Sequence, residues 1–281
     1  MADYSARRFE HLPPAAAGLG AMLLRPRAVA IACLLAVAGA GWLSLAMLAA
    51  QTSSGAGIWD ALAALCRPAS AGSGFSPSSL ALALGMWSAM TLAMMLPTAA
   101  PMILTYADIA ETAAARKLPV ISPFVLVAGY CAVWLGFAFA AAGLQEGVVR
   151  PALQGAASAN AATVLSAALF VVAGLYQFSS LKAACLSACQ QPFQFFFRHW
   201  KTHARGVFGL GLQQGMHCLG CCWAMMLLMF AGGAMNPLWM AALGGVMTVE
   251  KMTSGRRLSL AIGVALLAIG LAVAAFGVAY R

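Results

Sequence analysis

Charge is scarce in this chain. Only 8% of its 281 residues are Asp, Glu, Lys or Arg, and only seven of these are acidic. Soluble globular proteins are about 25% charged and about 45–50% apolar, whereas 63% of these residues are hydrophobic. A water-soluble enzyme, a disordered chain and a small secreted disulfide module are therefore excluded. The composition predicts an all-α protein, a polytopic bundle of transmembrane helices.

The apparatus of hydrolysis and phosphoryl transfer is also missing. The seven carboxylates lie in tails, in loops or at the ends of apolar runs, and no glycine-rich phosphate loop is present. The four histidines are too scattered to indicate a catalytic triad. We therefore expect no catalytic residues and no enzyme activity, with thiol redox chemistry as the alternative.

Long apolar runs, in contrast, are frequent. Crossing ~30 Å of hydrocarbon takes about 20 mostly apolar residues. Seven segments are expected to do so, namely 28–50, 80–106, 121–145, 159–179, 206–233, 237–250 and 257–279. The sixth is short, but Asn236 as a cap and Pro237 at the first helical position mark its start. Residues 1–27 are expected to form a basic cytoplasmic tail and residues 28–281 a single transmembrane domain.

The basic residues are distributed as topology requires. With the N-terminus in the cytoplasm and the C-terminus outside, thirteen of the sixteen Lys and Arg fall inside, as the positive-inside rule favours. The net charge of +9 is thus explained by orientation in the membrane. We expect membrane lipid as a partner and no nucleic acid.

Sulfur is abundant and clustered. Of sixteen methionines, thirteen fall within residues 86–102 and 216–252, and five of the eight cysteines fall within residues 185–222. Met86, Met90 and Met94 are four apart and share one helical face, as do Cys218 and Cys222. Thioethers and thiolates are soft ligands that favour Cu(I), while Zn(II) is accepted mainly by thiolates.

The two sulfur-rich helices are expected to meet. Cys218 lies about 18 Å along the fifth span, near mid-membrane, and Met94 and Met95 lie at a similar depth. Pro97 and Pro101 each remove a backbone hydrogen bond beside these methionines, and transporters place sites at such breaks. The expected metal-binding residues are Cys218, Cys221, Cys222, Met90, Met94, Met95, Met102, Cys185 and Cys189. Ordinary core packing of the methionines and simple proline kinks are the alternatives.

The connection 180–205 carries two further signals. Its run from Phe193 to Trp200 mixes aromatic and basic residues, which predicts a helix lying in the membrane interface. Cys185 and Cys189, followed by His199 and His203, have the ligand types of a Cys₂His₂ zinc site with a shortened central gap. Zn(II) is therefore the second candidate metal.

Glu250 and Lys251 end the sixth span. Either they form an ion pair at an exposed helix end, which is worth little, or they are partly buried and serve gating or charge transfer.

Three ordered blocks resemble an integral membrane family described as predicted metal-binding, the domain of unknown function 2182. The blocks are Trp87-x2-Met90-x2-Ala93-Met94-Met95-Leu96-Pro97-x3-Pro101-Met102, then Tyr176-Gln177 with Lys182-x2-Cys185-Leu186-x2-Cys189-x2-Pro192, then Gly215-x2-Cys218-Leu219-Gly220-Cys221-Cys222-Trp223 running on to Glu250-Lys251. The resemblance covers about residues 80–255 and departs at Gln190, where the family often has Arg. It implies metal binding in a bacterial inner membrane and leaves the metal open.

Three hypotheses follow. The leading one is a multi-pass protein of the cytoplasmic membrane that binds and moves a soft metal, Cu(I) first, with Cys185 and Cys189 as a cytoplasmic relay to a metallochaperone. The second is a membrane thiol–disulfide oxidoreductase, in which paired cysteines pass electrons. The third is an assembly factor that holds copper for a metalloenzyme complex.

Overall fold

The computed structural model describes residues 77–152, 158–231, 237–253 and 255–279, together with the single positions Ala36, Gly39 and Leu43. The regular elements of this part of the chain are all helical. They are α5 (Pro77–Ala115), α6 (Pro123–Leu144), the π-helix η2 (Gln145–Val149), α7 (Arg150–Ala152), α8 (Ser158–Tyr176), α9 (Ser180–Gln190), α10 (Pro192–His199), α11 (Ala204–Leu227), α12 (Pro237–Met252) and α13 (Arg256–Ala279). The expected all-α class is confirmed for these residues. The expected first span, 28–50, and the basic tail lie outside them, apart from the three single positions.

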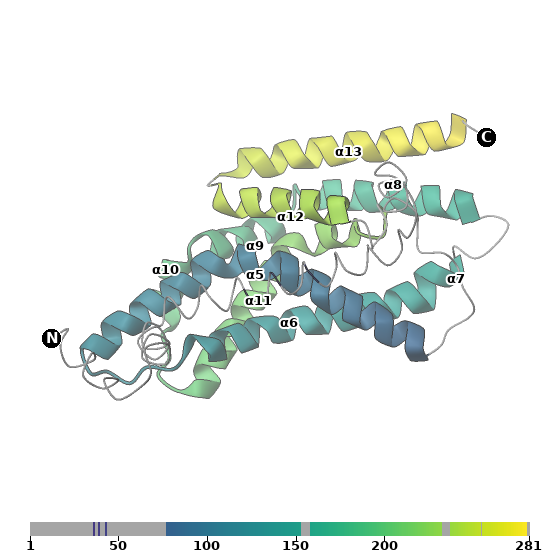
Figure 1. Cartoon of the computed structure of the whole chain (residues 1–281). Coiled ribbons are helices and arrows are strands. Elements are labelled where there is room, and N and C mark those ends of the chain that lie inside the picture. The colour runs from purple at the N-terminus through teal and green to yellow at the C-terminus, as the bar shows by residue number, and fades with distance from the viewer. Residues whose placement is uncertain are drawn as a thin grey trace.

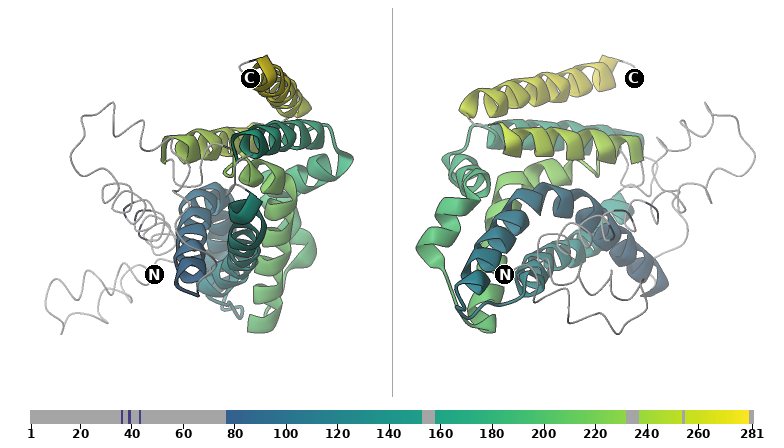
Figure 2. Two further views of the ribbon diagram at one scale, coloured as in Figure 1. Left: turned by 90° about the vertical axis from the view of Figure 1, so that its right-hand side faces the viewer. Right: turned by 60° about the vertical axis from the view of Figure 1, so that its left-hand side comes forward.

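The helices form two groups that meet along α9 and α11. In the lower group of Figure 1, α6 packs against both α5 and α11. In the upper group, α13 packs along α8, while α12, drawn just below α13 in Figure 1, packs on α5. Figure 2 shows the same division from two other directions. Helix α9 packs on α11 and also reaches α12, so it connects the two groups.

Glycines bring α6 and α11 into backbone contact. A Cβ added at Gly211 would lie 2.1 Å from the carbonyl oxygen of Leu126, and one added at Gly129 would lie 2.2 Å from that of Phe208. Small residues permit this close approach between apolar helices. The contact fixes α11 against α6 and holds the middle of α11, with its cysteines, beside Tyr130.

Helix α5 is long and bent. Its 39 residues would extend about 58 Å if straight, and Figure 2 shows it turning near its middle. Pro97 and Pro101 lie inside the helix, where each removes a backbone hydrogen bond. The methionine-rich part of α5, including Met90, Met94 and Met95, is buried in the core next to this bend.

Of the seven expected membrane spans, the first lies outside the described residues, and fewer than the other six have the length and hydropathy that a crossing needs. Three segments there are long and apolar enough to cross a membrane, namely Pro77–Ala115, Pro123–Ala152 and Arg256–Phe276. The pair Asn160–Tyr176 and Ser180–Gln190, bent by 68°, adds a fourth if it forms one span. Helix α11 carries Gln213, Gln214 and His217, which lower its hydropathy, and α12 has only 16 residues. The apolar pattern thus locates these two helices correctly but overstates their capacity to cross a bilayer.

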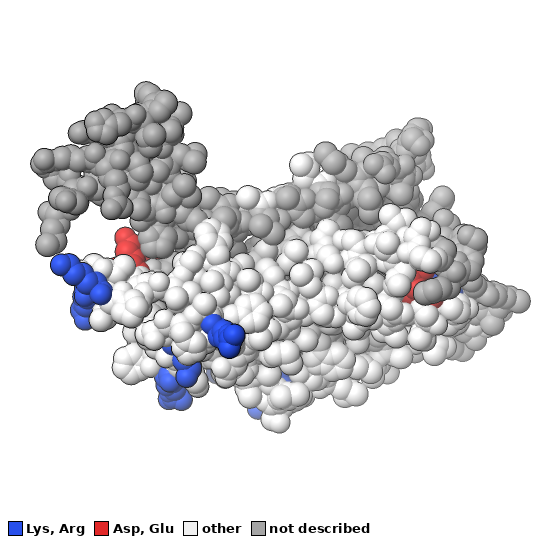
Figure 3. Space-filling view, turned by 90° about the horizontal axis from the view of Figure 1, so that it is seen from below, with Lys and Arg blue, Asp and Glu red and all other residues white. Residues whose placement is uncertain are grey.

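The surface agrees with an apolar environment around much of the bundle. Figure 3 shows a face on which Lys and Arg, with one acidic group, gather toward one end, and a broad uncharged area separates them from a second acidic group near the other end. Exposed side chains on the bundle include Phe139, Leu271 and Phe276. An uncharged surface of this kind indicates a lipid or protein partner.

The connection 180–205 is more ordered than expected, because it contains two helices. The Ser179 hydroxyl accepts a hydrogen bond from the backbone N–H of Leu181 and caps α9, a helix that the apolar pattern does not predict. The expected interfacial helix is α10, in which Phe193 and Phe197 are exposed and Phe195 is buried.

Candidate metal centre

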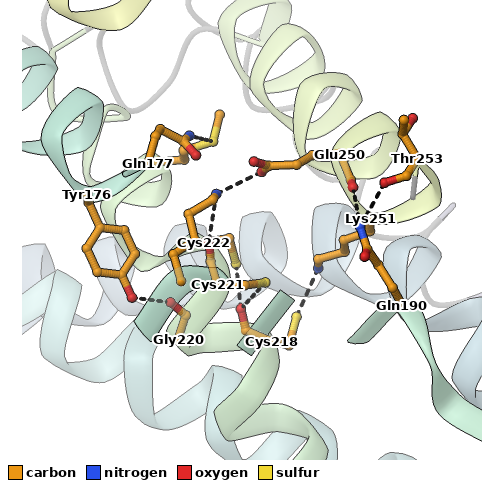
Figure 4. A network of polar contacts seen from close by, with 12 residues as sticks. Tyr176, Gln177, Gln190, Cys218, Gly220, Cys221, Cys222, Glu250, Lys251 and Thr253 are labelled. Atoms are coloured by element: carbon orange, nitrogen blue, oxygen red, sulfur yellow. Dashed lines mark hydrogen bonds and ion pairs between the residues drawn. The ribbon is translucent and has the colours of Figure 1, made fainter. Parts of the chain in front are cut away.

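Three buried cysteines lie on the inner part of α11. Cys218, Cys221 and Cys222 are each at most 3% exposed and form no disulfide. The thiols of Cys221 and Cys222 donate hydrogen bonds to the carbonyl oxygen of Cys218, at 3.0 and 2.9 Å. Both thiols are therefore turned toward the preceding turn of their own helix (Figure 4).

A methionine of α5 completes a sulfur contact between two helices. The Sγ of Cys222 lies 3.9 Å from the Sδ of Met95. The carbonyl oxygen of Met95 accepts hydrogen bonds from the Tyr130 hydroxyl at 3.0 Å and from the Thr98 hydroxyl at 2.9 Å. The carbonyl group of Met95, two residues before Pro97, is therefore fixed by side chains from both α6 and α5. The sulfur-bearing faces of α5 and α11 meet here, as the sequence predicts.

Cys218 is held by polar groups from two other helices. Its Sγ lies 3.0 Å from the Tyr130 hydroxyl of α6 and 3.0 Å from the Nζ of Lys251 at the end of α12. The same Nζ donates to the Thr98 hydroxyl at 2.8 Å. An ammonium group can only donate hydrogen bonds, so Cys218 is the acceptor and is well placed to be a thiolate.

Helix α9 adds a fourth cysteine. Cys189 lies near Cys218 and Cys221, while Cys185, one turn earlier, packs against Gly220, where an added Cβ would meet its Sγ at 2.6 Å. We call Cys189, Cys218, Cys221, Cys222 and Met95 the sulfur cluster. Cys185 and Cys189, expected in the connection between two spans, lie half-buried on α9, a helix that packs on α11.

A buried ion pair lies beside the sulfur cluster. The Nζ of Lys182 on α9 lies 2.8 Å from a carboxylate oxygen of Glu250 on α12, with side chains only 1% and 3% exposed. Lys182 also donates to the carbonyl oxygen of Cys221 at 3.0 Å. Gln190 donates to the backbone carbonyls of Glu250 and Thr253 (Figure 4). These bonds tie α9 and α12 to α11.

The expected roles of two charged residues need correction. Glu250 and Lys251 do not form an exposed helix-end pair with each other, because Glu250 turns to Lys182 and Lys251 turns to Cys218. Lys182, which the positive-inside rule assigns to the cytoplasmic surface, is buried. Lys182 lies on the same helical face as Cys185 and Cys189, at positions i, i+3 and i+7. That spacing is the sequence signal that could have indicated that Lys182 faces the cysteines. For Tyr130 and Thr98 the sequence offers no comparable signal.

The remaining predicted ligands lie apart from these contacts. Met90 and Met102 are buried in the same core, and Met94 packs toward Gly244, its Cε 3.3 Å from an added Cβ.

The Cys₂His₂ zinc site is not assembled. His199 bonds through a ring nitrogen to the carbonyl oxygen of Phe195, and His203 packs against Gly206. Within the described ranges, no three His, Cys, Asp or Glu side chains are placed as ligands of one ion.

Comparison with known proteins gives one match. The family model described as "PpoB2: Copper chaperone" matches residues 84–273, which are 190 of the 281 residues. No curated protein and no solved structure gives a significant match. The match confirms a copper-related family; it does not carry the label of the integral membrane family that the sequence blocks resemble.

Proposed function

The chain belongs to the PpoB2 copper chaperone family, and we propose that it binds Cu(I) at the sulfur cluster and hands the ion to a partner. The observation that carries this proposal is the contact between Cys222 Sγ and Met95 Sδ, buried between α11 and α5. A thiolate and a thioether are soft donors of the kind that selects Cu(I). Copper is here the cargo of the protein.

The sulfur spacing fits a bound ion. A metal–thiolate bond of about 2.3 Å places two sulfurs of a trigonal site about 4 Å apart. The Cys222 and Met95 sulfurs are 3.9 Å apart, so an ion between them requires no movement of the two helices. We infer that Cys218 supplies the third sulfur, and that Cys222 loses its hydrogen bond to the Cys218 carbonyl when its thiol gives up the proton on binding the metal.

Cys221 and Cys189 serve transfer in this proposal. Both lie next to Cys218, and a thiolate can replace another at the metal by exchange. Cys185 lies one turn from Cys189 on the same face of α9 and is only half-buried, so it is the place at which an incoming or outgoing ion meets a partner. Zinc is less suited, because zinc sites use Cys and His ligands, whereas the closest sulfur pair of the cluster includes the thioether of Met95, a soft donor that favours Cu(I).

Location and partner follow from the same features. The three or four membrane-competent segments support an integral, multi-pass protein of the bacterial cytoplasmic membrane. The buried sulfur cluster and the copper chaperone family support a role in copper homeostasis by holding and delivery, to a metallochaperone or to a metalloenzyme under assembly. A stronger form of the proposal is that the protein also moves copper across the membrane. Testing it requires transport measurements in sealed vesicles.

The test is metal stoichiometry. We expect the full chain, purified in detergent under anaerobic reducing conditions and loaded with Cu(I), to retain near-stoichiometric copper by mass spectrometry. The variant with Cys218, Cys221 and Cys222 all changed to Ser should retain none. Cys131→Ser, on α6, is the matched control because it removes a free cysteine outside the sulfur cluster.

A second function is favoured by one contact. The closeness of Cys189 to Cys218 and Cys221 would also allow a disulfide between α9 and α11. A wild-type protein that binds no copper but forms this disulfide reversibly, counted by thiol titration, would favour the oxidoreductase.

A further inference from the structure

One ammonium group is aimed at the sulfur cluster itself. The Nζ of Lys251 lies 3.0 Å from the Sγ of Cys218 and 2.8 Å from the Thr98 hydroxyl, and Figure 4 shows it reaching the cluster from α12. A cation is an unexpected neighbour for a site that binds a metal ion, because the two positive charges repel each other. Its presence requires a reason beyond packing.

The adjacent ion pair does not cancel this charge. Lys182 and Glu250 lie 2.8 Å apart and neutralise each other. Among the residues that the structure describes, no carboxylate lies within ion-pair distance of Lys251. The centre therefore carries one positive charge before any thiol ionises, and the thiolate of Cys218 balances it.

We propose that Lys251 makes the centre selective for monovalent metal ions, an inference that rests on the proposed copper site. With Cys218 and Cys222 as thiolates, Lys251 and one Cu(I) supply two positive charges against two negative ones. The loaded centre is then neutral. A divalent ion in the same position leaves a net positive charge buried, which is costly. Its repulsion by Lys251 is also twice as large, because the Coulomb energy scales with the charge of the ion.

Charge must be separated from softness in any test. Cu(I) and Zn(II) differ in both properties. Ag(I) and Cd(II) are better probes, because both bind thiolates well and differ by one unit of charge. The quantity that isolates the role of Lys251 is the affinity for Cd(II) relative to that for Ag(I), compared between variants.

The experiment uses the full chain in detergent, reduced and oxygen-free, with each affinity measured by competition against a chelator. Lys251→Gln removes the charge and keeps a hydrogen-bond donor without adding a sulfur ligand. We expect it to raise the Cd(II) affinity relative to that for Ag(I) by about tenfold or more. Lys251→Arg keeps the charge and should preserve the wild-type ratio. Lys182→Leu with Glu250→Leu, which leaves the net charge unchanged, is the matched control and should also preserve it.

Two outcomes would overturn the proposal. Lys251→Gln could leave the ratio unchanged, or it could weaken both metals equally, which is the behaviour of a purely structural residue. If the glutamine variant does not fold, Lys251→Leu removes the same charge. The ratio of its Cd(II) affinity to its Ag(I) affinity then tests the proposal. A wild-type protein that binds neither Ag(I) nor Cu(I) would instead contradict the copper site on which the inference rests.

Discussion

The buried pair of Lys182 and Glu250 gives the sharpest prediction about stability. Replacing Lys182 with Leu leaves the Glu250 carboxylate buried without a counter-charge, and its second oxygen already has no hydrogen-bond partner among the residues that the structure describes. The variant uses leucine rather than methionine, because a new thioether beside the sulfur cluster could bind metal.

The magnitude follows from the burial of both side chains, which are 1% and 3% exposed. Removing one partner of a buried ion pair costs about 3–5 kcal/mol. The lost bond to the Cys221 carbonyl adds about 1 kcal/mol. Since 1 kcal/mol lowers the melting temperature of chains near this size by about 2–4 °C, we expect the melting temperature to fall by about 8–24 °C.

The double variant, Lys182→Leu with Glu250→Leu, separates the cost of an orphaned charge from the worth of the pair. Replacing both members by apolar groups is often neutral or stabilising, so most of the lost melting temperature should return. Thermal unfolding of the detergent-solubilised protein, followed by circular dichroism, measures both. A single variant that melts within about 2 °C of wild type, or a double variant no better than the single one, would refute the reasoning.

Two further substitutions test the packing and the centre. Gly211→Ala places a Cβ 2.1 Å from the Leu126 carbonyl and should destabilise the bundle by about 1–3 kcal/mol or more, whereas Gly209→Ala, with nothing within 4 Å of its added Cβ, should not lower the melting temperature. Tyr130→Phe removes the hydroxyl that bridges α5 and α11 and should weaken Cu(I) binding roughly three- to tenfold in chelator competition. Tyr106→Phe loses only a hydrogen bond to the Ile121 carbonyl and should not weaken Cu(I) binding. Equal losses of Cu(I) affinity in the two tyrosine variants would show that Tyr130 does not contribute to the copper site.

Helical periodicity explains what the sequence could predict. Residues four apart share a face, so spacing alone places Cys218 and Cys222 on one helical surface and the methionines of α5 on another. Their contact through Cys222 and Met95 is confirmed. The start of α12 at Pro237 was likewise predictable, because proline is favoured at the first position of a helix.

Contacts between segments far apart in the chain explain what it could not predict. The positive-inside rule treats each lysine as facing water, so it assigns Lys182 to a loop. Its spacing from Cys185 and Cys189 shows only that the three share a helical face; its burial follows from the contact with Glu250, 68 residues later. The same holds for Lys251 and Cys218, 33 residues apart. Helix α9 is hard to predict because it has only 11 residues, and its cysteine spacing also fits a metal-binding loop.

The central claim is that copper is held by sulfur from α11 and α5. X-ray absorption at the copper edge of the Cu(I)-loaded full chain tests it most directly, because it reports the elements bound to the metal and their distances. The account predicts a shell of sulfur alone at about 2.3 Å, with fewer sulfur neighbours in Met95→Leu. A shell containing nitrogen or oxygen, or one unchanged in that variant, would contradict it.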